Sequence, residues 1–328
     1  MSLKQRFRTS MKKVNGDLLT PISIFQRLQG KRKFLLESSA KYEGNGRYSF
    51  IGVNPRKTYS GIDQKLRDFS HLTQKEYFYE GELVQLLKQV MPRVSSHTEY
   101  PFTGGGIGYM HALPNTVPTL QFHVYDTLII FDHLTEEIAV FHTNIEAEQV
   151  EPNIDELIHE LFSTPTPAET SYTLSSFEKQ SGSTYSAVFS GDAFALYRNL
   201  RVQFASAYMY YVEFDECTLI GTSPSSYIQI RDGALSTMNH EINIERFCQQ
   251  ETIEKAQHQQ QGQLTSSFHA IDVVKELQPP HGLIGYIGFN GQVDFTAPTN
   301  MMTIIGQVAH IQTLHSDTSP SFSSLMKG

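Results

Sequence analysis

The sequence is poor in cysteine, with two in 328 residues, and it contains no tryptophan. Cys217 and Cys248 lie far apart and form no Cys-x-x-Cys motif, which excludes a zinc ribbon and a thioredoxin-like redox site. No apolar run approaches the roughly 20 residues that cross a bilayer. The basic residues near the first methionine are not followed by the apolar stretch of a signal peptide. We therefore expect a soluble, cytoplasmic protein with no membrane partner.

Basic side chains are the scarcer charge, because 26 Lys and Arg against 34 Asp and Glu give a net charge of -8. This balance argues against a broad basic face and so against nucleic-acid binding. Apolar residues make up 39% and charged residues 18%, which supports a sizeable buried core and excludes a disordered chain. Small molecules or other proteins are the expected partners.

The chain divides at a stretch in which Ser, Thr, Pro and Gly replace periodic apolar residues. At roughly 150 residues per domain, the length allows two domains or one large domain. We predict a first region at 11–162, a linker at 163–185 and a second region at 186–328.

The secondary structure is predicted to be α+β with antiparallel sheets. Asn153 and Asp192 each precede an amphipathic helical pattern, and a third helix is expected over 268–277. Strands come in pairs that are joined by short turns. Hairpins are expected over 126–143 and at the turns Asp232-Gly233, Asn290-Gly291 and Gly306-Gln307.

A short sequence echo links the two halves: Gly-Ile-Gly-Tyr at 106–109 recurs as Leu-Ile-Gly-Tyr at 283–286. A structural duplication and a chance match both explain it. If it is a duplication, it suggests two sheets of similar build.

Common catalytic and binding motifs are missing. The glycine-rich run at 104–108 lacks the strand before it and the helix after it that a dinucleotide site needs. Ser223 lies in a turn-like Thr-Ser-Pro context, not in a Gly-x-Ser-x-Gly elbow. His258 lies in a glutamine-rich stretch that is typical of a solvated helix, and no histidine pair has metal-ligand spacing. The carboxylates after Gln249 are too scattered to form a magnesium cage.

Ordered matches along most of the chain resemble one known family. They lie at 19–55, 101–109, 125–133, 192–201, 206–214, 219–233 and 282–295, with shorter matches between 242 and 279. These segments resemble anthranilate synthase component I, the chorismate-using subunit of tryptophan biosynthesis. Matches in the family's order are far more specific than any single motif.

This resemblance implies a fold of two facing antiparallel β-sheets with helices outside, in agreement with the hairpins. It also implies conversion of chorismate to anthranilate with Mg²⁺, and feedback inhibition by tryptophan. The nitrogen would come from ammonia that a glutamine amidotransferase subunit delivers. Chorismate, tryptophan and this subunit are thus the implied partners.

Several positions match the family's functional residues. Those that match its tryptophan site are Leu36, Glu37, Ser38, Arg47, Tyr48, Ser49, Tyr208 and Met209. Those that match substrate-binding or catalytic positions are Gly221, Ser223, Gly285, Tyr286 and His258. Without the resemblance, we would interpret the strand that contains Glu37 as plain structure.

The sequence departs from the family where catalysis takes place. Ser225 stands at a glutamate position and Asn300 at an arginine position. The glycine-rich, magnesium-binding segment expected after Thr237 is absent, and a serine-rich stretch at 317–321 replaces the terminal magnesium-binding carboxylates. The resemblance therefore implies magnesium, but we find no ligands for it in this chain. We predict poor chorismate turnover.

Two other functions stay open. The chain could be a non-catalytic regulatory or assembly module that binds tryptophan or an amidotransferase. It could also be an enzyme of the related aminodeoxychorismate synthase type.

Overall fold

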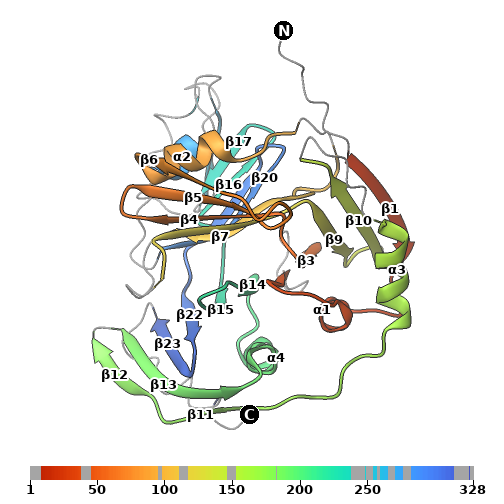
Figure 1. The fold of residues 1–328 in the computed structure, drawn as a ribbon, viewed down its shortest axis with the longest axis vertical. Helices are drawn as coiled ribbons and strands as arrows, with labels where there is room; N and C mark the ends of the chain where they lie inside the picture. The colour runs from red at the N-terminus through yellow and green to blue at the C-terminus, as the bar shows by residue number, and fades with distance from the viewer. Residues whose placement is uncertain are drawn as a thin grey trace.

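A computed structural model describes most of the chain, and Figure 1 shows its fold. The described residues are 9–37, 46–94, 98–110, 117–145, 153–181, 183–237, 248, 254–256, 259–264, 270–275, 282–313 and 325. Two large antiparallel sheets face each other, and the helices pack against their outer sides. The prediction of α+β with two facing antiparallel sheets is confirmed.

The first sheet has twelve strands in the described residues. Its order is β1 (Thr9–Asn15), β10 (Glu137–Thr143), β9 (Thr127–Asp132), β3 (Tyr48–Gly52), β2 (Phe34–Glu37), β14 (Tyr208–Glu213), β15 (Thr218–Ser223), β22 (Asn300–Ile305), β23 (Val308–Thr313), β13 (Thr184–Gly191) and β11 (Tyr172–Leu174), with β12 (Glu178–Ser181) also on β13. The expected hairpins at 126–143 and at Gly306-Gln307 are β9–β10 and β22–β23.

The second sheet has eleven strands in the same described ranges. Its order is β18 (Glu254–Ala256), β19 (Gln259–Gln263), β17 (Ala234–Thr237), β16 (Ile228–Arg231), β21 (Val293–Thr296), β20 (Leu283–Gly288), β7 (Gly105–Met110), β8 (Leu120–Tyr125), β4 (Lys57–Ile62), β5 (Lys65–Ser70) and β6 (Glu76–Glu80). The other two expected hairpins are β16–β17 and β20–β21.

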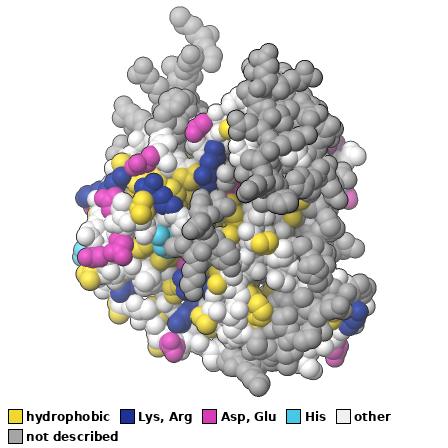
Figure 2. All heavy atoms as spheres, turned by 180° about the vertical axis from the view of Figure 1, so that it is seen from behind, with side chains coloured by type: hydrophobic (Ala, Val, Ile, Leu, Met, Phe, Trp, Pro, Cys, Tyr) yellow, Lys and Arg dark blue, Asp and Glu magenta, His cyan; other side chains and the backbone are white. Residues whose placement is uncertain are grey.

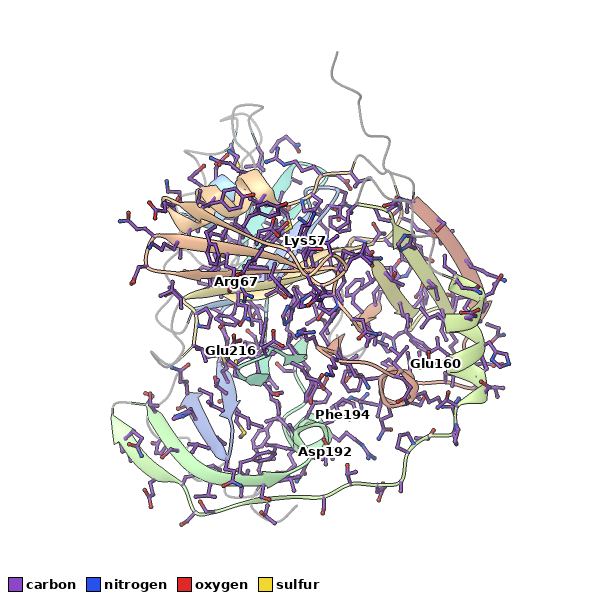
Figure 3. All side chains as sticks on the ribbon, viewed as in Figure 1. Lys57, Arg67, Glu160, Asp192, Phe194 and Glu216 are labelled. Atoms are coloured by element: carbon purple, nitrogen blue, oxygen red, sulfur yellow. The ribbon has the colours of Figure 1, made fainter. Side chains whose placement is uncertain are left out.

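The helices lie on the outer faces of the sheets. Helices α1 (Pro21–Arg27), α3 (Ile154–Ser163) and α4 (Ala193–Gln203) contact the first sheet, and α2 (Leu83–Val90) and α5 (Ala270–Lys275) contact the second. The Asn153 and Asp192 side chains accept hydrogen bonds from the first turns of α3 and α4, so both predicted N-caps are confirmed. Figure 3 shows Asp192 and Phe194 at the start of α4.

A third apolar cluster fills the space between the sheets. It combines Phe34 and Leu128 of the first sheet with Ile107 and Tyr286 of the second, and all four side chains are buried. There are therefore three apolar layers: one lies between the two sheets, and one covers the outer face of each sheet. Both faces of each sheet are buried in this way.

The order of elements repeats along the chain. Two series of elements can be matched one to one, and matched strands occupy equivalent positions in the two sheets. The first series is β1, α1, β2, β3, β4, β5, β6, α2, β7, β8, β9, β10, and the second is β13, α4, β14, β15, β16, β17, β19, α5, β20, β21, β22, β23. This correspondence favours a structural duplication over a chance match. Gly108 pairs with Gly285 inside the second sheet, so the two echoes lie side by side in one sheet, and each sheet contains strands from both halves.

The segment expected as a linker, 163–185, contains β11 and β12. Both strands pair with β13, and buried Tyr172 and Leu174 anchor β11 in the outer cluster of the first sheet. Backbone pairing thus orders a segment whose composition predicts irregular structure. The proposed boundaries at 11–162 and 186–328 stay a prediction.

The described surface mixes charges of both signs. On the face shown in Figure 2, basic and acidic side chains lie next to one another. No helix in the described ranges has the length and apolar character that a membrane span requires.

Two histidines share one threonine in the second sheet. Thr58 Oγ1 lies 2.7 Å from His71 Nε2 and 2.7 Å from His123 Nδ1. Burial lowers the pKa of the His71 imidazole to about 4, and burial also holds the pKa of His123 well below its usual range. Both rings are therefore neutral at pH 7.

We expect this pair to make the fold acid-sensitive. A histidine whose folded-state pKa is lowered stabilises the fold above the unfolded pKa of about 6.5, and this contribution is lost as the pH falls toward about 4. His71→Gln should flatten the fall in unfolding free energy between pH 7 and pH 4 by about 1 to 2 kcal/mol, allowing for solvent screening. Urea unfolding at several pH values measures this. Parallel curves for the variant and the wild type would contradict it.

Candidate functional site

A cavity of about 420 Å³ lies between the two sheets, and we call it the central cavity. Strands β2, β3 and β14 of the first sheet and β20 and β21 of the second contribute to its walls, together with the segment 98–101. Its lining residues are Leu36, Glu37, Arg47, Tyr48, Phe50, Thr98, Glu99, Tyr100, Pro101, Tyr208, Met209, Tyr210, Arg231, Asp232, Ile284, Gly285, Tyr286, Gln292, Asp294 and Thr296.

The structure brings most of the expected effector residues together here. Those that line the central cavity are Leu36, Glu37, Arg47, Tyr48, Tyr208 and Met209. They are far apart in sequence but adjacent in space because β2 pairs with both β3 and β14. Ser38 and His258 lie outside the described residues. The roles assigned to these residues stay predictions.

Ser49 has a different environment from its neighbours Tyr48 and Phe50. Its hydroxyl lies 2.8 Å from His133 Nε2, and it is not part of the cavity lining. Side chains alternate along a strand, so Ser49 faces the helix side of the first sheet.

Glu37 contributes to the wall, but its carboxylate is engaged by α4. Oε2 accepts hydrogen bonds from Tyr197 Oη at 2.6 Å and from Arg201 Nε at 2.9 Å. The residue is 5% exposed. Two donors on one oxygen, one of them charged, hold this carboxylate toward the helix.

Asp294 is the buried carboxylate of the cavity wall. Ser226 Oγ donates to its Oδ1 at 2.8 Å, while Gln229 Nε2 and Tyr208 Oη donate to Oδ2 at 2.6 and 3.3 Å. Burial raises the pKa of this carboxyl, although the hydrogen bonds and Arg231 at 3.8 Å oppose the shift. A cationic group in the cavity would therefore interact favourably with it.

Asp294 is a cavity residue that the sequence motifs did not identify, since it is one of the scattered carboxylates after Gln249. A signal was available, because Asp294 is an acidic residue between apolar residues in the buried strand β21. Buried carboxylates usually need partners, which makes such a position a candidate site.

Aromatic side chains form much of the remaining wall. The rings of Tyr48 and Tyr100 are 5.4 Å apart, and those of Phe50 and Tyr286 are 6.0 Å apart. The buried hydroxyls of Tyr210 and Tyr286 make no hydrogen bond of normal geometry to the described residues. Arg231 lies beside the Tyr286 hydroxyl. Burial raises the pKa of both phenols, so both are donors at neutral pH.

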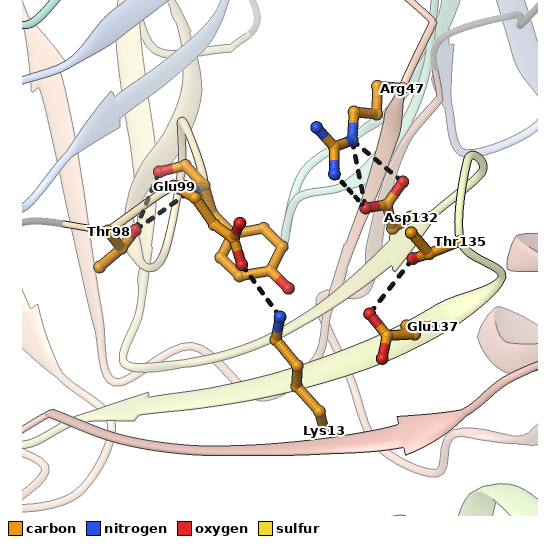
Figure 4. A network of polar contacts seen from close by, with 8 residues as sticks. Lys13, Arg47, Thr98, Glu99, Asp132, Thr135 and Glu137 are labelled. Atoms are coloured by element: carbon orange, nitrogen blue, oxygen red, sulfur yellow. Dashed lines mark hydrogen bonds and ion pairs between the residues drawn. The ribbon is translucent and has the colours of Figure 1, made fainter.

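Charged residues lie at the Arg47 end of the cavity. Arg47 donates to Asp132 at 2.8 Å and stacks over Tyr48 at 4.9 Å, and Lys13 donates to Glu99 at 2.9 Å. Figure 4 shows both ion pairs, which join Arg47 to Asp132 at the end of β9 and Lys13 of β1 to Glu99 of the segment 98–101. The Arg47 end thus offers a cation and a carboxylate to a polar ligand.

The matched substrate positions do not all line the cavity. Gly285 and Tyr286 do, but Gly221 and Ser223 do not. Gly221 makes room for the Tyr210 side chain, since a Cβ there would lie 2.1 Å from Tyr210 Oη. Ser223 Oγ bonds the Ala297 carbonyl oxygen at 3.2 Å. Both residues support the walls of the site.

The described residues do not provide a magnesium site. No three His, Cys, Asp or Glu side chains converge among them, and both Asp294 oxygens already accept hydrogen bonds. The residues at 317–321 lie outside the described part of the chain.

The fold and one sequence segment define the class of protein. Residues 181–239 match the family model described as chorismate binding enzyme. The menaquinone-specific isochorismate synthase of Escherichia coli superposes with a TM-score of 0.58 at 13% identity, over 98% of this chain and 94% of that one. Together with the two facing sheets, these matches define a chorismate-binding-enzyme type of fold.

Within this class, the chain is similar in sequence to anthranilate synthase component 1. It is 27% identical over 276 residues to anthranilate synthase component 1 of Lactococcus lactis and 30% identical over 284 residues to that of Bacillus subtilis. These matches cover 69% and 67% of this chain but 59% and 55% of the relatives, so the chain spans less than two thirds of their length. Anthranilate synthase component I from Streptococcus pneumoniae has the same fold, with a TM-score of 0.63 at 18% identity over 96% of this chain and 97% of that one.

Replacing Asp294 should have opposite effects on stability and binding. Because the pKa of Asp294 is raised, its ionised form costs stability, and this cost is absent below the usual carboxyl pKa of about 4 and grows as the pH rises. Asp294→Asn should therefore unfold at higher urea concentration than the wild type at pH 8. It should also weaken binding of an ammonium-bearing ligand by about tenfold or more. A variant less stable than the wild type at pH 8 would show that the Arg231 interaction dominates instead.

Proposed function

We propose that this chain is an anthranilate synthase component I-like regulatory protein that binds tryptophan in the central cavity. The observation that carries the proposal is that six of the eight matched effector positions line this one cavity, together with Asp294 and several aromatic rings.

The lining is suited to a zwitterionic aromatic ligand. Tyr48, Phe50 and Tyr286 offer ring faces to an indole, and their contact area would supply most of the binding free energy. Asp294 is placed to accept the ligand ammonium, since Glu37 is already engaged by α4. Arg47 and Arg231 are guanidinium groups of the lining that can receive the ligand carboxylate.

Ligand fluorescence tests this proposal directly. The chain contains no tryptophan, so added tryptophan can be followed without protein indole background. We expect a saturable change in emission, and Tyr48→Ala should weaken binding by about tenfold through loss of ring contact. Tyr77→Ala is the matched control, because Tyr77 is 55% exposed on β6 and outside the cavity. A flat titration up to millimolar ligand would contradict the proposal.

Chorismate turnover by this chain is proposed to be weak. Ser225 and Asn300 occupy positions where the family has an acid and an arginine, and no magnesium cluster supports the leaving group among the described residues. We expect anthranilate fluorescence at least about 100-fold below that of a complete relative in an assay with chorismate, Mg²⁺ and ammonia. Robust production that EDTA abolishes would overturn this expectation. Analysis of the product would separate anthranilate from aminodeoxychorismate.

A glutamine amidotransferase subunit is the proposed protein partner, because the relatives carry the name component 1 and a folded exterior can outlast an active site. Stable docking needs well over about 1,000 Å² of buried surface. Co-expression followed by light scattering measures the assembly. A chain that stays at 37.1 kDa with excess partner would exclude this role.

A further inference from the structure

A second cavity, of about 550 Å³, lies on the helix side of the first sheet, and we call it the outer cavity. Helix α4 forms one wall and the segment before β11 forms another. Its lining residues are Thr20, Ile22, Glu169, Thr170, Ser171, Tyr172, Ala195, Arg198, Asn199, Arg201 and Val202. None of them lines the central cavity.

Hydrogen bonds fix the walls of the outer cavity. Asp192 N donates to the Ser171 carbonyl oxygen at 3.0 Å, and Thr170 Oγ1 bonds the Asp192 carboxylate. Asn199 Nδ2 donates to Tyr172 Oη, which in turn donates to the Leu325 carbonyl oxygen at 2.8 Å. Figure 1 shows the chain between α3 and β11 passing along the outer side of α4. The segment before β11 is therefore held in place before any ligand arrives, which lowers the entropic cost of binding.

Two arginines one turn apart on α4 line this cavity. Residues spaced three apart lie on the same helix face, so the Arg198 and Arg201 side chains are neighbours. Arg201 Nε donates to buried Glu37, and its two terminal nitrogens make no hydrogen bond to the described residues. The Glu37 contact thus orients the guanidinium and leaves its outer edge available.

Arg198 is held only loosely by protein. Its partner is Glu169, at 3.4 Å, and the Glu169 side chain is 87% exposed. Exposed pairs of this kind contribute little, so an anion in the cavity can displace Glu169. The lining then presents two guanidinium groups against a single exposed carboxylate.

We propose that the outer cavity is a binding site for a small anion that carries a phosphate or a pair of carboxylates, held by Arg198 and Arg201. Guanidinium groups donate two parallel hydrogen bonds to either chemistry, and the hydroxyl of Ser171 can add a further donor. The site does not depend on tryptophan binding in the central cavity, so each can fail without the other.

Thermal unfolding at constant ionic strength tests the site, with inorganic phosphate and malonate as separate probes against a chloride reference. A saturable rise in the midpoint is expected with at least one probe, and the stronger one identifies the chemistry. Equilibrium dialysis with labelled phosphate or malonate measures the affinity. Lack of saturation with both probes up to tens of millimolar, at a concentration where chloride has no effect, would overturn the proposal.

Two variants and a control locate the binding. Arg198→Gln should weaken anion binding about fivefold or more, while Glu169→Gln should strengthen it because the competing carboxylate is removed. Arg67→Gln is the control, since Arg67 forms a similarly exposed pair with Glu76 on the second sheet. Glu169→Gln distinguishes a binding site from a structural effect, because loss of structure cannot tighten binding. Equal affinity in Arg198→Gln and the wild type would show that the anion binds elsewhere.

Discussion

The close approach of strands at the centre of the second sheet is the constraint on which the site depends. A Cβ at Gly108 would lie 2.0 Å from the Gln121 carbonyl oxygen, and one at Gly285 would lie 2.0 Å from the Asp294 carbonyl oxygen. Only glycine fits such a contact with backbone. These two glycines also face each other where β7 pairs with β20. The join between the halves and the position of Asp294 therefore depend on the same pair of residues.

The repeated order of elements gives this protein two related places between the sheets, and the central cavity lies in the second of them. In the first half, Gln121 is opposite Tyr109, and it bonds Tyr109 and Glu216 while Phe214 packs on the Tyr109 ring. In the second half, Asp294 takes the place of Gln121 opposite Tyr286, and the central cavity lies beside it. In the first half, a hydrogen-bond network from Tyr109 through Gln121 to the Glu216 carboxylate thus occupies this place. A buried carboxylate beside open space equips the second half for a ligand.

The outer face of the first sheet extends this arrangement. Glu37 lies between the central cavity and α4, and the Arg201 that holds it also lines the outer cavity. One buried carboxylate thus organises residues on both sides of a single sheet. Replacement of Glu37 by a neutral residue would leave Arg201 without the contact that orients it. The loss of stability is expected to be large, because hydrogen bonds to a buried charged group contribute more than neutral ones.

The sequence by itself determined the fold class and the local structure. Alternating strands with turn residues such as Asp232-Gly233 specified antiparallel hairpins, and Asn153 and Asp192 specified helix starts, because turns and caps depend on neighbours in the chain. The ordered resemblance to a known family indicated the effector positions. What only the tertiary structure decided is which of them meet: it placed Tyr48 and Tyr208 in one cavity, directed Ser49 and the Glu37 carboxylate to the helix side, and paired the two Gly-Tyr echoes in one sheet. These outcomes depend on which strands distant in the chain pair with each other, and on which face of the sheet each side chain lies. Local sequence patterns do not specify either of these.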